Sequence, residues 1–334
     1  MKYGLFITAD KTLYLTAPSF GCSTSPYKEK LMMAISHFNE YKIKTVNGPY
    51  IYNQLDLLSS TPKECANDFM YAYKNYDYIL SVGGGEAMIQ LLPYIDFDEL
   101  KKLQPKLFMG YSDNTILTFL LPTICDVASV YGLNAPGFGT TSLLPYQKDQ
   151  LDLMLGKKLS FNGYEKYETT SLRTDDNPCI EINPTEPSII TSYPNNNITL
   201  TGRIIGGCID VLSTIIGTKY DNVCNFNNKY NDLLWFFEAC DMTPIEVYRR
   251  LLQMKYSGWF NNAKGFLFGR PFIRDVMFNK TYKDYIIDAL ADLKLPIIFD
   301  LDIGHVPPQI PVIVGSVATI KVNDSKYSIS YELK

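Results

Sequence analysis

The sequence lacks the features that would place the chain in a membrane or on nucleic acid. It contains no run of about 18 apolar residues, the least that a membrane-spanning helix needs. The apolar stretch near the start is interrupted by Asp10 and Lys11, so we expect no signal peptide. Acidic residues number 35 against 31 basic ones, and no segment is dense in lysine or arginine. This balance argues against a nucleic-acid partner.

Histidine is scarce, and the cysteines follow no ligand pattern. The chain has two histidines and no CxxC or HxxxH spacing, so we expect no protein-built zinc site. Its seven cysteines are odd in number and scattered, which favours reduced thiols in the cytoplasm over a disulfide framework. Hydrophobic residues at 46% and charged residues at 20% are typical of a globular protein.

What the sequence does contain is an alternation of two periodicities. Short apolar runs rich in β-branched and aromatic residues alternate with segments of helical period, which predicts an α/β fold with parallel sheets. In the first part, the pattern predicts strands at 12–18, 41–46, 77–82 and 106–109, and helices at 26–39, 62–74, 86–92 and 113–121. Later, it predicts helices at 207–216, 243–256 and 281–291, and strands at 233–237, 264–269 and 296–300.

Between these two parts the alternation stops. Residues 151–200 are rich in proline, asparagine and threonine and are interpreted as an irregular linker. We therefore expect an N-terminal α/β domain at 1–150 and a C-terminal α/β domain at 201–334. The last residues alternate as a β meander does, with a turn at 322–326, so the C-terminal domain should end in a β-rich tail.

Candidate site residues stand at the carboxyl ends of predicted strands, where open α/β sheets bind their ligands. The first group is the triple glycine 83–85. Its backbone could approach an anion or an oxyanion closely, or it could simply make a tight strand–helix turn. A phosphate loop is disfavoured because the pattern GxxxxGK[ST] is absent.

The second group is Gly110-Tyr111-Ser112-Asp113. A sharp strand-to-helix corner exposes one side chain and directs the following N–H at the same point, as in a nucleophile elbow. Here Ser112 would be the nucleophile and Asp113 would supply the N–H. The same residues also fit a helix N-cap, with Ser112 or Asp113 as the capping residue.

Two further strand ends carry a carboxylate and an imidazole. Glu238 directly follows an apolar strand and could orient a histidine or form an ordinary ion pair. His305 lies in a Gly/Pro-rich loop after a strand, whereas His37 lies in the middle of a predicted helix, so His305 is the better candidate base for a serine. Cys240 could be a nucleophile, although a buried thiol is the commoner explanation. The residues thus fit a Ser112–His305–Glu238 triad.

Seven segments in the same order resemble one known family over almost the whole chain: APSFG (17–21), GGGEAMIQLLPYIDFDEL (83–100), GYSDNT (110–115), YGLNAPGFG (131–139), GRIIGGCIDVLSTIIGT (202–218), the stretch 233–270, and DIGHVPPQIPVIVG (302–315). The family is that of the LD-carboxypeptidases and microcin C immunity (MccF-like) proteins, which are cytoplasmic serine peptidases. The most specific parts are the GYSD turn and the Gly-His loop.

The resemblance assigns roles to the residues that match. Ser112 would be the nucleophile, Glu238 and His305 would complete the triad, and the oxyanion hole would use the N–H of Asp113 with that of Gly84 or Gly85. The resemblance also implies a homodimer, an N-terminal domain like the class I glutamine amidotransferases, and no metal or organic cofactor.

By the same resemblance, the expected substrate is a murein tetrapeptide cut before its terminal D-alanine during peptidoglycan recycling. The alternatives are an aminoacyl nucleotide of the microcin type (a sulfamoyl or phosphoramidate compound) and non-catalytic binding of a small molecule. Three departures bear on the substrate: the glycine turn reads Val82 to Glu86, Ile313 replaces a proline, and 161–200 lacks tryptophan. Arg270, after strand 264–269, could face a substrate carboxylate or form a salt bridge.

Overall fold

The computed structural model describes residues 1–8 and 12–334, which form two compact units. Unit 1 comprises Met1–Lys158, Thr170–Asn183 and Pro311–Ile313, and unit 2 comprises Leu159–Thr169, Pro184–Ile310 and Val314–Lys334. The segment 151–200, expected to be a linker, is thus divided between the two units. In the described ranges, no helix is both long and apolar enough to cross a membrane.

Unit 1 is built on a parallel sheet. The strand order is β14-β5-β4-β3-β1-β2, with β1 (Thr12–Thr16), β2 (Lys44–Asn47), β3 (Tyr78–Ser81), β4 (Leu107–Gly110), β5 (Ser129–Tyr131) and β14 (Val312–Val314). Strands β1 to β5 pair in parallel, so their carboxyl ends meet at one edge. Since Leu80 is paired with Met109, the chain that follows β3 and the chain that follows β4 leave the sheet next to each other.

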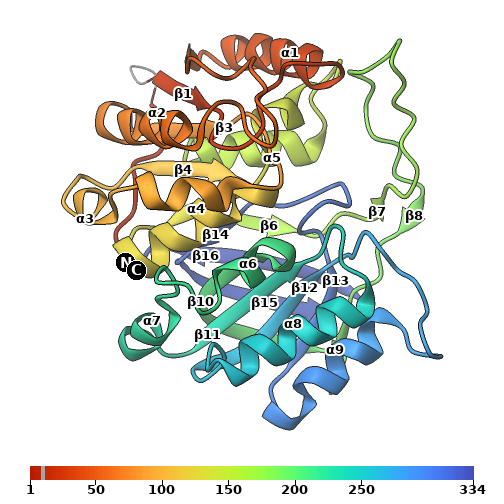
Figure 1. Ribbon diagram of the computed structural model, residues 1–334. Coiled ribbons are helices and arrows are strands. Elements are labelled where there is room, and N and C mark those ends of the chain that lie inside the picture. Colours follow the sequence, from red (N-terminus) through yellow and green to blue (C-terminus); the bar gives the residue numbers. More distant parts are fainter. Residues whose placement is uncertain (9–11) are drawn as a thin grey trace. The chain divides into compact units, whose positions relative to one another are not determined.

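Helices connect these strands (Figure 1). They are α1 (Tyr27–Glu40), α2 (Pro62–Asn75), α3 (Phe97–Leu100), α4 (Thr115–Leu120) and α5 (Pro145–Met154). Helix α2 begins with a capping box in which Thr61 and Glu64 bind each other's backbone N–H. The helix expected at 86–92 is instead a 3₁₀ helix, Met88–Tyr94, that contains Pro93, which has no N–H to extend a helical ladder.

Unit 2 contains an eight-stranded mixed sheet among the described residues. Its order is β6-β16-β15-β10-β11-β12-β13-β9, with β6 (Ser160–Asn162), β16 (Lys326–Glu332), β15 (Val317–Asn323), β10 (Ile198–Cys208), β11 (Leu233–Glu238), β12 (Ala263–Gly269), β13 (Ile297–Leu301) and β9 (Thr191–Tyr193). Strands β10 to β13 are parallel, and β15 and β16 form the expected hairpin. A small ribbon joins β7 (Lys166–Tyr167) to β8 (Glu186–Pro187).

The helices of unit 2 are α6 (Ile209–Ile215), α7 (Val223–Lys229), α8 (Pro244–Tyr256) and α9 (Tyr282–Leu290), and α8 and α9 lie side by side (Figure 1). Strand β11 is buried along its whole length, as the unbroken apolar run LLWFF predicts for a central parallel strand. Trp235 stacks on Trp259 with ring centroids 5.5 Å apart. This packing holds the strand whose last residue is Glu238.

Candidate active site

Ser112 occupies a strained corner at the end of β4. Its φ is +64°, a left-handed conformation that costs a non-glycine residue on the order of 1 kcal/mol. The residues that precede the two helical segments here are Tyr111 and Asn114, and neither makes a side-chain capping bond within the described part of the chain. The capping positions therefore fall on other residues than Ser112 and Asp113. The positive φ at Ser112 fits a nucleophile elbow, and its role as a nucleophile stays a prediction.

The carboxylate of Asp113 fastens this corner to two neighbouring segments. It accepts a hydrogen bond of 2.5 Å from the Ser19 hydroxyl and one of 2.9 Å from the backbone N–H of Met88. The side chain is buried, and burial raises its pKa, while the hydrogen bonds that it accepts act in the opposite direction. Asp113 thus links the loop after β1, the segment after the glycine turn and the elbow.

The glycine turn passes directly beside the serine. An ideal Cβ on Gly84 would lie 2.9 Å from the Cβ of Ser112 and 3.0 Å from its Oγ, closer than side chains approach each other without a shift. Gly85 has a φ of +155°, and its Cβ would meet the Ser19 Oγ at 2.2 Å. Of the two glycines expected to complete an oxyanion hole, Gly84 is the one whose α-carbon borders Ser112.

In unit 2, Glu238 and His305 form a hydrogen-bonded pair. Glu238 ends β11 and is fully buried, and its Oε2 lies 2.8 Å from Nδ1 of His305. Gly304 permits this approach, since its φ is +102° and a Cβ there would lie 2.5 Å from the same oxygen. A buried carboxylate bound to Nδ1 fixes the orientation of the imidazole, as a triad requires.

Asp210, which the sequence analysis did not single out, holds the loop that follows Glu238. Its carboxylate accepts hydrogen bonds from three consecutive backbone N–H groups, those of Cys240 (3.2 Å), Asp241 (3.0 Å) and Met242 (3.1 Å). No pattern in the sequence predicts this contact, because it joins the first turn of α6 to a loop thirty residues later. Asp210 therefore holds in place the loop that directly follows Glu238, the carboxylate that binds His305.

Cys240 also belongs to this part of unit 2. Burial raises the pKa of its thiol, and a side-chain hydrogen bond with His305 lowers it by less. With the pKa raised overall, the thiol stays protonated near neutral pH, which makes it a poor nucleophile. The thiol is half-buried, and its role as a reacting group is not favoured.

Arg270 is bound within unit 2. Its buried guanidinium pairs with Asp302, donates to the Ser188 hydroxyl at 2.8 Å, and lies 4.6 Å over the ring of Tyr167. The Asp302 carboxylate also accepts a hydrogen bond from the Tyr327 hydroxyl. These contacts account for the position of Arg270 as part of a buried ion pair, and its contact with a substrate carboxylate stays a prediction.

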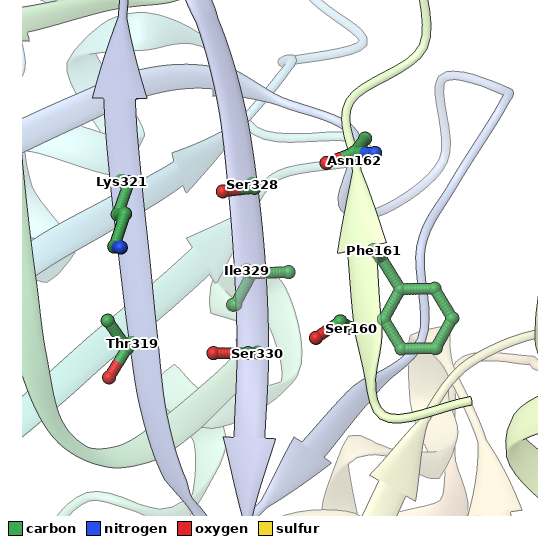
Figure 2. A pocket seen from close by; sticks show the side chains of 8 residues that line it. All are labelled: Ser160, Phe161, Asn162, Thr319, Lys321, Ser328, Ile329 and Ser330. Carbon is green, nitrogen blue, oxygen red and sulfur yellow. The ribbon is translucent and has the colours of Figure 1, made fainter. Parts of the chain in front are cut away.

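A shallow hollow of about 300 Å³ lies on the outer strands of unit 2 (Figure 2). Hydroxyl, amide and amine groups line most of it, and the residues are Ser160, Phe161, Asn162, Thr319, Lys321, Ser328, Ile329 and Ser330. None of the site residues expected from the sequence is among them. The hollow is therefore separate from the Glu238–His305 pair of the same unit.

Comparison with known proteins places both parts of the chain in one group. A model of the LD-carboxypeptidase N-terminal domain matches residues 13–132, and a model of the LD-carboxypeptidase C-terminal domain matches residues 201–320. Among curated proteins, the microcin C7 self-immunity protein MccF of Escherichia coli is 23% identical, covering 92% of this chain and 90% of its own. The probable murein peptide carboxypeptidase of Bacillus subtilis is 24% identical, covering 89% and 86%.

Solved structures agree with the fold. MccF in complex with glutamyl sulfamoyl guanosine superimposes with a TM-score of 0.83 at 19% identity, covering 99% of both chains. An MccF-like protein from Bacillus anthracis str. Ames gives a TM-score of 0.84 at 22% identity, covering 100% of both. The two-domain α/β architecture with parallel strands is thereby confirmed.

Proposed function

The chain belongs to the LD-carboxypeptidase family (peptidase family S66), and from this premise we propose that it is a serine carboxypeptidase acting on murein tetrapeptides. It would hydrolyse the amide bond to the terminal D-alanine. The observation that supports this most is the hydrogen bond between the buried Glu238 and His305, because a carboxylate 2.8 Å from Nδ1 is what a catalytic imidazole needs. The strained corner at Ser112 supplies the matching nucleophile.

In the proposed mechanism, Ser112 is the nucleophile and His305 is its general base. The imidazole takes the hydroxyl proton as Oγ bonds to the carbonyl carbon, and Glu238 holds Nδ1–H and stabilises the cation. The N–H groups of Asp113 and Gly84 receive the oxyanion. The C–N bond then breaks, D-alanine leaves with the proton from His305, and water hydrolyses the resulting ester. No metal or organic cofactor takes part.

A second candidate reaction is cleavage of the aminoacyl bond in a microcin-type nucleotide. The similarity to MccF favours it, since that protein has been solved with glutamyl sulfamoyl guanosine and with aspartyl sulfamoyl adenosine. The same triad would serve, because the bond attacked is again an acyl–nitrogen bond. The family resemblance further implies a cytoplasmic homodimer and a role in peptidoglycan recycling. Light scattering on the purified protein would test whether it is a dimer.

A parallel assay on both substrates tests the proposal. We expect purified protein to release D-alanine from a murein tetrapeptide, identified by product mass, and to act more slowly on an aminoacyl sulfamoyl adenosine. The reverse preference would select the second candidate. Saturable binding of either compound without any product would instead make the chain a small-molecule binding protein.

Replacing Cys240 with alanine is expected to lower kcat by less than about tenfold. The change removes one hydrogen bond to His305, and such a bond contributes about 0.5–1.5 kcal/mol. Steady-state kinetics on the tetrapeptide measure the effect. A complete loss of turnover in Cys240→Ala, with the protein still folded, would make the thiol the nucleophile and would remove Ser112 from that role.

A further inference from the structure

Asn134 lies beside Ser112, and the proposed mechanism does not use it. It follows β5 in the segment YGLN, and only 7% of the residue is exposed. Because buried amide groups are costly unless they are hydrogen-bonded, the partners of each end of this side chain indicate its purpose.

The orientation of the amide is fixed by its neighbours. Its Oδ1 accepts from the backbone N–H of Tyr111 and from Nδ2 of Asn114, each at 3.2 Å. The Asn114 amide is fixed in turn, because its Nδ2 also donates to the carbonyl oxygen of Gly83 at 2.7 Å. Two donors therefore face Oδ1, which leaves the NH₂ group of Asn134 on the opposite side.

That NH₂ group lies close to Gly84 and, through it, to Ser112. The ideal Cβ position of Gly84 lies 3.8 Å from Nδ2 of Asn134 and 3.0 Å from Oγ of Ser112. Because Gly84 carries no Cβ, the amide of Asn134 and the hydroxyl of Ser112 both border the same glycine. Among the described residues, no hydrogen bond from this Nδ2 to a protein acceptor is recorded.

We propose that the side-chain amide of Asn134 is a further oxyanion donor, which binds the acyl oxygen of the substrate as Ser112 attacks. The inference deepens the proposed function and rests on it. The two hydrogen bonds at Oδ1 hold the amide in place before the substrate arrives, so it stabilises the developing charge without reorganisation. Being neutral, it needs no counter-charge when the site is empty.

The test exchanges the donor for an acceptor with no change of shape. In Asn134→Asp one carboxylate oxygen still accepts from Tyr111 and Asn114, while the other replaces the NH₂ group. We expect kcat on the tetrapeptide to fall by about 10²–10³-fold, KM to change by less than about threefold, and Tm to stay close to that of the wild type. Gly84→Ala, whose Cβ would press on the Cβ and Oγ of Ser112, should also reduce kcat.

Asn227 provides the matched control. It is equally buried at 7%, and its amide donates to the carbonyl oxygens of Gly258 and Trp259 in unit 2. Asn227→Asp sets a carboxylate against those oxygens, so it should lower Tm while leaving kcat unchanged. This pattern separates a loss of stability from a loss of transition-state binding.

A second assay works without the natural substrate. A fluorophosphonate forms an Oγ–P bond with a catalytic serine as fluoride leaves, and the phosphonyl oxygen occupies the oxyanion position. The rate of Ser112 phosphonylation, followed by mass spectrometry, should fall at least tenfold in Asn134→Asp. An active wild type with an unaltered Asn134→Asp variant in both assays would overturn the donor role and leave the proposed function standing. A wild type inert in both assays would overturn the two together.

Discussion

Replacing Ser112 with alanine is expected to reduce kcat by roughly 10⁴–10⁶-fold, since removal of a triad nucleophile leaves only the catalysis that the oxyanion site and substrate binding provide. The variant should still fold, because serine, which has a Cβ as alanine does, already adopts the left-handed conformation at position 112. Product formation from the tetrapeptide and Tm, measured on the same preparation, give the two readouts.

The control for Ser112→Ala is Ser129→Ala. Ser129 is a buried serine of the same unit, and its hydroxyl donates to the carbonyl oxygen of Thr118 at 2.6 Å. Losing that bond should lower Tm and spare kcat. Residual hydrolysis by Ser112→Ala at more than about a hundredth of the wild-type rate would show that another group attacks the substrate.

The second large effect is expected at His305. His305→Gln should also lower kcat by roughly 10⁴-fold or more, because an amide cannot take and return the proton of Ser112. Glutamine is preferred to alanine here, since it keeps a polar side chain of similar length beside the buried Glu238 carboxylate. Alanine would only remove the hydrogen bond to that carboxylate, and such a loss at a buried acceptor costs about 1–3 kcal/mol.

His37→Gln provides the comparison. His37 is buried in α1, where Nε2 lies 2.8 Å from the carbonyl oxygen of Thr140, a contact that a glutamine amide can reproduce. We expect full activity from this variant. If His305→Gln were as active as His37→Gln, the general base would have to be a group other than an imidazole, because the chain has no third histidine.

The sequence predicted those parts of the fold that local patterns encode. The apolar run LLWFF predicted strand β11, and the helical period over 243–256 predicted α8, which the structure shows to begin with a capping box of Thr243 and Glu246. The sequence did not predict strand β10, which runs to Cys208. The helix that was expected from residue 207 begins only after that strand, at Ile209. The reason is Gly206, where a Cβ would lie 1.8 Å from the carbonyl oxygen of Phe236, so the strand depends on a neighbour that periodicity cannot reveal.

In the candidate site, too, the sequence predicted residues in local motifs but not the contacts between distant segments. Ser112 and His305 belong to short motifs that contain glycine, and such motifs can be recognised without coordinates. The contacts of Asp113 with Ser19 and of Asp210 with the loop after Glu238 could not be predicted, because each joins segments far apart in the chain. Strand β5, of three residues, is too short for a pattern to detect.

The interleaving of the two units has a consequence for how the protein is made. Unit 1 takes Pro311–Ile313 from near the end of the chain, and β14, which contains part of this segment, lies at the edge of the unit 1 sheet next to β5. A ribosome must therefore translate at least as far as β14 (Val312–Val314) before the sheet of unit 1 can be completed. A fragment that stops at residue 150 would emerge with that edge uncovered, which is a template for aggregation.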